Sequence, residues 1–247
     1  MPPKPSPIYL KIAESLRERI GAGEFRAGDK LPSERKLSET LGVNRLTIRR
    51  AFSHLESIGV INRQHGGGTF VALPKLERRA AELVPFTLAM RQQGFAPGDR
   101  VIHFEKQVAS KTVAEKLKLR ESETVYSIYR IRLISTEPVM LERFFVSARR
   151  FPKFEQYDHT ERSGYEIMAT EYGVRVEQAE QSLEPVVASQ TEAGLLGITQ
   201  GSPLMLERRL SFDTEGQPVE FGKDLYRGDK FRFTTQMAPL LFSYARD

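Results

Sequence analysis

The sequence predicts an α+β protein with two domains, a small helical domain that ends in a β-hairpin and a larger domain built on an antiparallel sheet. Three observations lead to this prediction. Residues 31–71 pass from helical to strand patterns at glycine turns, the excess of basic charge lies before residue 73, and long β-rich runs follow residue 84. A chain of 247 residues has room for about two domains of ordinary size.

The first domain is predicted to contain three helices. Residues 8–20 form the first, because isoleucine and leucine recur there every four residues. A turn-rich loop leads to a second helix, which Ser33 caps and Gly42 ends. Asn44 caps a third helix, whose apolar residues follow the i, i+3, i+4, i+7 pattern. These apolar residues are Ile48, Ala51, Phe52 and Leu55.

The start of the third helix carries Arg45 and Arg49 one turn apart, with Thr47 between them. A helix-turn-helix places these turns in the DNA major groove, where arginine can bond guanine and a threonine methyl can contact thymine. Ordinary surface arginines on a solvated helix face are the alternative. The hairpin INRQHGGGTFV favours DNA binding, because a glycine tip lets the backbone lie close to a phosphate or in the minor groove.

Residues 9–71 resemble the winged helix-turn-helix of the GntR family of bacterial transcription regulators. The resemblance is carried by PSERKLSETLGVNRLTIRRAF and LESIGVINRQHGGGTFV. It implies that the PSER arginine, the start of the recognition helix and a wing glycine contact the operator. By position these are Arg35, Arg45, Thr47, Arg49 and Gly67. Asn44 stands where a serine is common, which leaves the helix cap intact.

The charge distribution supports this assignment. Residues 1–72 contain 12 Lys or Arg and 7 Asp or Glu, whereas residues 73–247 contain 25 of each. The net charge of +5 therefore belongs entirely to the first segment. A generally basic protein would spread its excess along the chain, so the pattern indicates an electrostatic footprint for DNA.

Composition limits the other classes of protein. The chain has no cysteine, so neither a disulfide framework nor a thiolate metal site is expected. It has no run of about eighteen apolar residues, and MPPKPSPIY contains no apolar signal region. We therefore expect a soluble, cytoplasmic protein without membrane contact, metal or cofactor.

Residues 73–83 are short and charged and are predicted to link a domain at 1–72 to one at 84–247. In the second domain, two predicted hairpins share the same order of strand, acidic turn and second strand, and the second strand of each begins with Pro-Val. This similarity is a weak internal repeat. An antiparallel sheet with helices on one side is expected. The predicted strands are 101–110, 125–134, 138–147, 175–189, 203–213 and 218–226, and the predicted helices are 84–94, 112–119, 163–173 and 188–198.

Arg130 and Arg132 lie on one face of the strand 125–134, because side chains alternate along a strand. Two guanidiniums on a face that is otherwise apolar would repel each other and be poorly solvated. The anion between them is either a bound phosphate or carboxylate, which guanidinium forks fit well, or an internal carboxylate such as Glu142. Ser163 opens the helix SGYEIM, where it is either only a cap or also part of an anion site.

Residues 84–240 resemble the UTRA effector-binding domain of the HutC branch of GntR regulators, whose fold is like that of chorismate lyase. The resemblance is carried by FTLAMRQQGFAPGDRV, VYSIYRIRLISTEPVMLERFFV, SGYEIM and PVEFGKDLYRGDKFRF. It implies a homodimer with a small-molecule effector held over the sheet. A dimer would read an operator with an inverted repeat.

The resemblance also implies a set of effector-binding residues. In members that bind amino-sugar phosphates, the phosphate is met by residues that correspond here to Phe86, Thr87, Arg130, Arg132, Ser163 and Tyr165. The sugar end corresponds to Glu142, Glu220 and Tyr226. Thr87 replaces a serine and keeps its hydroxyl. Other members bind urocanate, fatty-acid-like or phosphonate-related ligands, so a carboxylate effector is the alternative to a phosphorylated sugar.

Two rival functions belong to other classes of protein. The lyase-like fold suggests an enzyme, but the histidines are scattered and no catalytic residue, nucleophile–base pair or metal cluster is apparent in the sequence. The histidines are His54, His65, His103 and His159. A DNA-coating protein without an effector would not need an arginine pair on an apolar strand face. The sequence thus predicts a DNA-binding regulator, expected to be a repressor, under the control of a small anionic metabolite.

Overall fold

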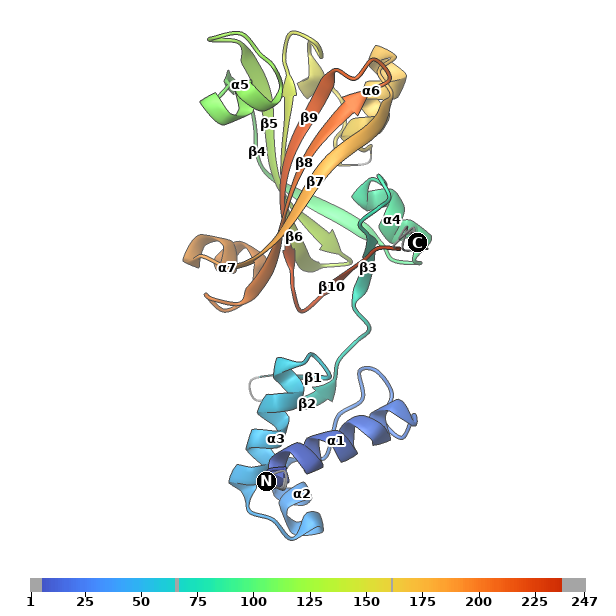
Figure 1. The fold of residues 1–247 in the computed structure, drawn as a ribbon, viewed down its shortest axis with the longest axis vertical. Coiled ribbons are helices and arrows are strands. Elements are labelled where there is room, and N and C mark those ends of the chain that lie inside the picture. The colour runs from blue at the N-terminus through green and yellow to red at the C-terminus, as the bar shows by residue number, and fades with distance from the viewer. Residues whose placement is uncertain (1–5, 65–66, 161, 237–247) are drawn as a thin grey trace, which may run out of the picture. The chain divides into compact units, whose positions relative to one another are not determined.

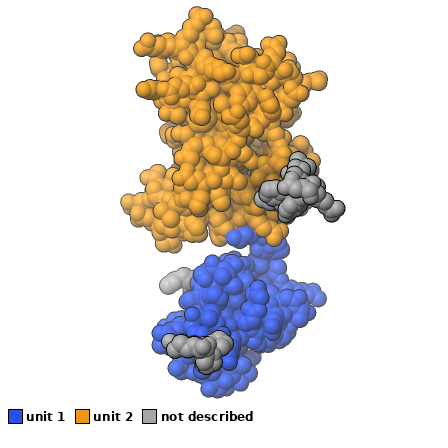
Figure 2. All heavy atoms as spheres, in the orientation of Figure 1, with its two compact units in different colours: residues 1–75 blue, residues 76–247 orange. Residues whose placement is uncertain are grey.

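The computed structural model describes residues 6–64, 67–160 and 162–236. The chain divides into two compact units, Met1–Lys75 and Leu76–Asp247 (Figures 1 and 2). The first unit has one hydrophobic cluster of buried residues and the second has four, and no cluster contains residues of both units.

The first unit contains the three predicted helices and the predicted hairpin. Its elements are α1 (Ile8–Gly21), α2 (Glu34–Leu41), α3 (Arg45–Ser57), β1 (Ile61–Gln64) and β2 (Gly68–Val71). The caps are those expected: Ser33 Oγ accepts from Lys36 N at 3.3 Å, Gly42 has a left-handed φ of 63°, and Asn44 Oδ1 accepts from Thr47 N at 2.8 Å. The winged helix-turn-helix is therefore confirmed as a fold.

The core of the first unit is the apolar stripe of α3. Ile48, Ala51, Phe52 and Leu55 are all fully buried, and they pack with Leu16 of α1 and Leu37 of α2. The hairpin β1–β2, which is the wing, is hydrogen-bonded to the rest of this unit. Leu31 N donates to Thr69 O at 2.8 Å, and Arg63 of β1 donates to the carbonyl of Arg49 on α3 at 3.0 Å.

The second unit is organised around a six-stranded antiparallel sheet of order β4-β5-β6-β9-β8-β7. Its strands are β4 (Pro97–Val108), β5 (Thr124–Ile134), β6 (Glu137–Ser147), β7 (Val176–Val187), β8 (Pro203–Asp213) and β9 (Pro218–Arg227). The two predicted hairpins, β5–β6 and β8–β9, lie side by side because β6 pairs with β9. This pairing makes the middle of the sheet from the two repeated segments.

Helices cover both faces of the sheet, so the expectation of helices on one side is wrong (Figure 1). Alternate residues of the central strands are buried in both directions, which requires cover on each side. On one face α4 (Phe86–Gln92) packs with Met140, and α6 (Gly164–Tyr172) packs with Phe144. On the other, α5 (Lys111–Lys116) and α7 (Gln190–Leu196) pack with residues such as Leu141 and Phe145. None of the described helices is long and apolar enough to cross a membrane.

The predicted linker contains a strand. Within residues 73–83, β3 (Leu76–Arg79) pairs in parallel with β10 (Phe231–Thr234), which the sequence did not reveal. Leu76 and Phe231 are buried in one cluster with Tyr226. The strand therefore belongs to the second unit, and the segment that follows it borders a cavity of that unit.

Candidate ligand-binding cavity and DNA-binding surface

A cavity of about 430 Å³ lies on the sheet face that α4 and α6 cover. Its wall comes from β5, β6, β9, β8 and β7 of the sheet, from the N-terminal ends of both helices, from β3 and the segment after it, and from β10. Eight of the nine predicted effector-binding residues line it: Phe86, Thr87, Arg130, Arg132, Glu142, Ser163, Tyr165 and Tyr226. Glu220 does not line it.

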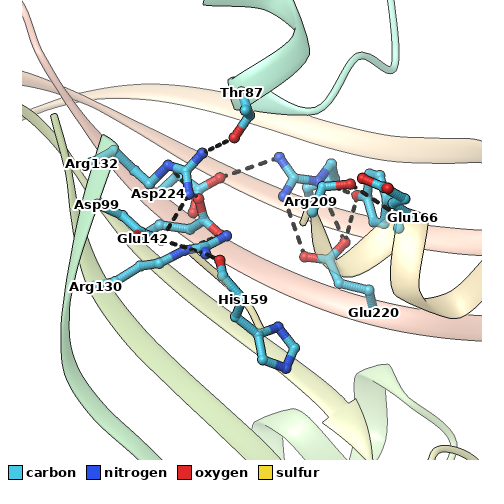
Figure 3. A network of polar contacts seen from close by, with 12 residues as sticks. Thr87, Asp99, Arg130, Arg132, Glu142, His159, Glu166, Arg209, Glu220 and Asp224 are labelled. Atoms are coloured by element: carbon cyan, nitrogen blue, oxygen red, sulfur yellow. Dashed lines mark hydrogen bonds and ion pairs between the residues drawn. The ribbon is translucent and has the colours of Figure 1, made fainter. Parts of the chain in front are cut away.

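Arg130 is engaged by protein groups on almost every side (Figure 3). Its Nε and Nη2 donate to Glu142 Oε1 at 3.1 and 2.7 Å, and its Nη1 donates to Asp99 Oδ2 at 2.7 Å and His159 O at 2.6 Å. Burial opposes its charge, but Glu142 and Asp99 outweigh that effect and raise the pKa of Arg130. Glu142 thus acts as the internal counter-ion that the sequence offered as one alternative.

Arg132 keeps more of its binding capacity. Its Nη1 shares Asp99 Oδ2 at 3.2 Å and its Nη2 donates to Thr87 Oγ1 at 2.5 Å, while its Cζ lies 4.6 Å from the Phe86 ring centroid. Its buried Nε has no hydrogen-bond partner and lies 3.6 Å from Glu142 Oε2. Burial and the charge of Arg130 lower the pKa of Arg132 to about 10. Arg132 is still charged at neutral pH, and an added anion would stabilise that charge.

Asp99 is a site residue that the sequence did not indicate. It lies opposite Arg132 in the β4–β5 register, its side chain is 1 % exposed, and one of its oxygens bridges Arg130 and Arg132. The segment Ala-Pro-Gly-Asp has the composition of a turn, and the strand was expected to start at Val101. The structure starts β4 at Pro97, which brings the carboxylate beside both arginines.

The N-terminus of α6 forms another part of the cavity wall. Ser163 Oγ accepts from Glu166 N at 3.1 Å, so Ser163 is an N-cap, and its hydroxyl hydrogen can still be donated. The first N–H groups of a helix have no acceptor within the helix and carry partial positive charge. Gly164 allows the start of α6 to lie close to Phe144 of β6, because a Cβ at this position would lie only 2.5 Å from the Phe144 ring.

Arg209 lies at the centre of a second charged cluster on the same face, which the sequence did not indicate (Figure 3). Its Nη1 donates to Glu207 Oε1 at 3.0 Å and Asp224 Oδ2 at 3.2 Å, and its Nη2 donates to Glu220 Oε1 at 3.3 Å. Gly222 gives the room for this reach, since a Cβ there would lie 3.0 Å from Arg209 Nη2. The alternation of Glu207 and Arg209 along one strand was the available signal.

Tyr165 and Glu220 are hydrogen-bonded to Arg209 and to each other in this cluster. Tyr165 Oη accepts from Arg209 Nε at 2.9 Å and contacts Ser211 Oγ at 2.8 Å and Glu220 Oε2 at 3.0 Å. Glu220 is fully buried behind the cavity wall. In the structure Glu220 is therefore a counter-ion for Arg209, and its predicted contact with a ligand stays a prediction.

Tyr226 and His159 are both packed among aromatic side chains of the second unit. Tyr226 is buried beside Phe86, and the Arg78 guanidinium lies 5.9 Å from its ring centroid. His159 packs between aromatic rings, and its Nε2 lies 2.9 Å from Phe154 O. His65 lies outside the described residues. Within the described ranges, no group of three or more His, Asp or Glu residues is placed to hold a metal ion.

The predicted DNA-contacting side chains lie at the start of α2, at the start of α3 and beside the wing. Arg35 is 77 % exposed and Arg45 is also exposed. Arg49 is half exposed, and its Nη2 donates to Glu34 Oε2 at 3.1 Å. Thr47 Oγ1 donates to the capping oxygen of α3 at 2.9 Å, so its methyl remains the group for a base contact. Gly67 lies in the turn before β2.

Comparison with known proteins gives the same division of the chain. The model of "Bacterial regulatory proteins, gntR family" matches residues 8–71 and that of the "UTRA domain" matches residues 92–232. The "HTH-type transcriptional repressor NagR" of Bacillus subtilis is 33% identical over 94% of this chain and 96% of its own. The "Histidine utilization repressor" of Pseudomonas putida is 28% identical over 92% and 91%. The crystal structure of PhnF from Mycobacterium smegmatis is 27% identical, covers 92% of this chain and 99% of its own, and superposes with a TM-score of 0.66.

Proposed function

This chain belongs to the GntR family of bacterial regulatory proteins, in the HutC branch that carries a UTRA domain, and on that premise we propose that a small sugar phosphate controls its hold on DNA. Its relatives are transcriptional repressors rather than enzymes, so it is a DNA-binding repressor with a small-molecule effector. The chemical class of the effector, the homodimer and the inverted-repeat operator are what we propose here.

The incomplete compensation of Arg132 carries the proposal of an anionic effector. Arg130 is enclosed by two carboxylates and a carbonyl, whereas Arg132, which also lines the cavity, donates to Asp99 and Thr87 and has a buried Nε–H without a hydrogen-bond partner. Thr87 and Ser163 add hydroxyls, and α6 adds the positive end of its dipole. A phosphate has three terminal oxygens for such donors, and a cavity of about 430 Å³ has the size of a small-ligand site.

The DNA-binding mode follows from the first unit. One helix-turn-helix reads one half-site, with the N-terminal residues of its recognition helix at the base edges. We propose that two copies of the chain bind an inverted repeat, with Arg35, Arg45, Thr47, Arg49 and Gly67 contacting each half-site. The exposure of both Arg45 and Arg49 supports these roles. The effector is proposed to release the operator, as expected for a repressor that responds to a metabolite.

The test is an operator-release experiment. The full-length protein selects its operator from a random DNA pool, and fluorescence anisotropy then follows that operator during titration with sugar phosphates, inorganic phosphate and urocanate. The proposal expects a sugar phosphate to release DNA where the parent sugar and inorganic phosphate do not. Release by urocanate alone would replace it with the carboxylate effector, and binding without an inverted repeat would overturn the proposed dimeric mode.

A further inference from the structure

One uninterrupted stretch of chain forms a side of the cavity. Residues 80–85, which we name the strap, join β3 to α4, and every one of them lines the cavity. The residues next to the strap line the cavity as well, and these are Arg78 and Arg79 of β3 and Phe86 and Thr87 of α4. A ligand that fills the cavity therefore contacts the strap.

The strap is fixed to other elements at its two ends. Ala80 N donates to Thr234 O of β10 at 2.7 Å, and the Ala80 carbonyl accepts from the Gln181 side chain of β7. At the other end, Pro85 O accepts from Ala89 N of α4 at 3.0 Å. The residues between these ends can respond to a ligand to the extent that no other group holds them.

Arg78 of β3 holds the second half of the strap. Its Nη1 donates to Val84 O at 3.0 Å, six residues further along the chain. Among the described residues, no other residue outside the strap is hydrogen-bonded to Leu83 or Val84. Glu82 N donates to Arg79 O at 3.1 Å, but this bond only closes a local turn. The link from β3 to the far end of the strap is therefore the Arg78 side chain.

The charge of Arg78 keeps its guanidinium inside the cavity. Its Cζ lies 5.9 Å from the Tyr226 ring centroid. Burial opposes the charge, but Tyr226, Glu207 and Asp224 outweigh that effect and raise the pKa of Arg78. Among the described residues Arg78 has no ion pair with Glu207 or Asp224, so the two carboxylates attract it without holding it by direct contact. This attraction favours the position from which Arg78 reaches the strap.

β3 is also the strand by which the chain enters the second unit. The first unit ends at Lys75, and Leu76 is the first residue of β3. β3 pairs in parallel with β10 (Figure 1), and Leu76 N donates to Lys230 O at 2.7 Å. Leu76 is buried in one cluster with Phe231. Arg78 thus lies two residues after the start of β3 and holds the strap at the same time.

We propose that Arg78 is a positioning residue that couples the strap to β3, so that a ligand against the strap acts on the strand that follows the DNA-binding unit. Without the bond to Val84, the strap adapts to the ligand while β3 keeps its place. This inference rests on the proposed function, because it assigns a route from the effector site to the control of DNA binding. Coupling between two sites is a free energy of its own, so its loss does not require weaker binding at either site.

The first test needs no ligand and follows hydrogen exchange along the full-length chain. Arg78→Ala should speed exchange at residues 81–84 by about tenfold or more, because a hydrogen bond from a charged donor is lost. Exchange in β3 and β10 should stay as in the wild type. Arg232→Ala is the matched control, since Arg232 is an exposed residue of β10 that pairs with Glu77 of β3 at 3.3 Å.

Two results of the exchange experiment would overturn the proposal. Unchanged exchange at residues 81–84 in Arg78→Ala would show that Arg78 does not hold the strap. Faster exchange in β3 and β10 as well would show that Arg78 stabilises the strand pair in general, which is a structural role.

The second test measures the coupling itself. Operator affinity is measured by fluorescence anisotropy with and without saturating D-glucosamine 6-phosphate, whose binding is followed by calorimetry. The wild-type ratio of the two affinities should be about 5–150, and Arg78→Ala should bring it close to 1. Operator binding without ligand should stay close to wild type and the ligand should still bind, which a merely structural role would not allow.

Two further variants separate the link to β3 from other effects. Arg78→Lys keeps a cation that can donate to Val84 O, so it should retain more of the affinity ratio than Arg78→Ala. Gln181→Ala removes a bond to the strap that comes from β7 and not from β3, so it should keep the wild-type ratio.

The outcomes distinguish this proposal from the proposed function. A wild-type ratio in Arg78→Ala, or an equal loss in Gln181→Ala, would overturn the coupling through Arg78 and leave the effector site standing. A wild type whose operator affinity no sugar phosphate changes would overturn the proposed effector instead. The exchange experiment would then still decide whether Arg78 holds the strap.

Discussion

Arg130 and Arg132 share a single carboxylate oxygen, Asp99 Oδ2, which accepts from the first at 2.7 Å and from the second at 3.2 Å. The two guanidiniums nevertheless have different surroundings. Glu142 and the His159 carbonyl complete the shell of Arg130, whereas Arg132 lies on the Phe86 ring and keeps an unpartnered N–H. We infer that Arg130 holds the site together and that Arg132 binds the ligand.

This difference predicts unequal losses of stability. Arg130→Ala leaves Glu142 and Asp99 buried without their main partner, and breaking a buried ion pair in this way costs about 3–5 kcal/mol. Arg132→Ala also relieves the repulsion from Arg130 and should cost clearly less. Chemical denaturation of the two variants measures both losses. Equal losses, or a larger one for Arg132→Ala, would contradict the division of roles.

The pKa of Glu142 predicts a pH dependence of stability. Burial acts to raise this pKa, but Arg130 and Arg132 outweigh it and lower the pKa to about 2. A group whose pKa is lowered by folding stabilises the protein above its ordinary pKa, and this contribution is lost as the pH falls toward the folded value. Glu142 should therefore contribute about 3 kcal/mol near neutral pH. The difference in free energy of unfolding between wild type and Glu142→Gln should become smaller as the pH falls from about 5 to about 2. A difference that does not change with pH would refute the ion-pair account.

The exposed arginines of α3 predict a specific effect on operator binding. Arg45→Ala should weaken operator binding by about 1–3 kcal/mol if the side chain bonds guanine, with little effect on random DNA. Arg49 must first leave Glu34, so Glu34→Gln should leave the operator contact of Arg49 intact or improve it. Arg17→Ala on α1 is the control. Equal losses on operator and random DNA would reduce Arg45 to a phosphate contact.

The wing glycines predict two different defects. Gly68 has a φ of 116°, a backbone conformation that residues with a Cβ rarely adopt, so Gly68→Val should destabilise the wing itself. Gly67→Val should leave the domain folded and weaken DNA binding, because a branched side chain blocks close approach to DNA. Thermal unfolding and operator binding of each variant separate the two effects. Normal operator binding by Gly67→Val would show that the wing stays clear of DNA.

The sequence revealed those parts of the fold that local signals determine. The caps Ser33 and Asn44 and the turn at Gly42 mark the helices of the first unit, and alternation along β5 places Arg130 and Arg132 on one face. These features depend on residues a few positions apart, so they can be seen without knowledge of the sheet order.

The parts that the sequence missed depend on distant segments. The pairing of β3 with β10 joins the two ends of the second unit, and LERR shows no strand alternation that would indicate it. Glu142, Asp224 and Glu207 lie in one row of the sheet only because β6 pairs with β9 across the two hairpins. Asp99 reaches the arginines because β4 begins before its turn-like segment ends. Each case needs the order of strands in the sheet.

The response of the operator complex to a sugar phosphate in wild type and Arg132→Ala tests the central claim most directly. Charge-assisted hydrogen bonds contribute about 1.5–3 kcal/mol each, so Arg132→Ala should weaken effector binding by about tenfold to a hundredfold or more. Effector-free operator affinity should be nearly unchanged, as in the control Arg143→Ala on the opposite face of the sheet. The account predicts that Arg132→Ala binds the operator and does not release it at the concentration of glucosamine 6-phosphate that frees the wild type. Release of both at the same concentration, or a wild type that no phosphorylated sugar affects, would contradict it.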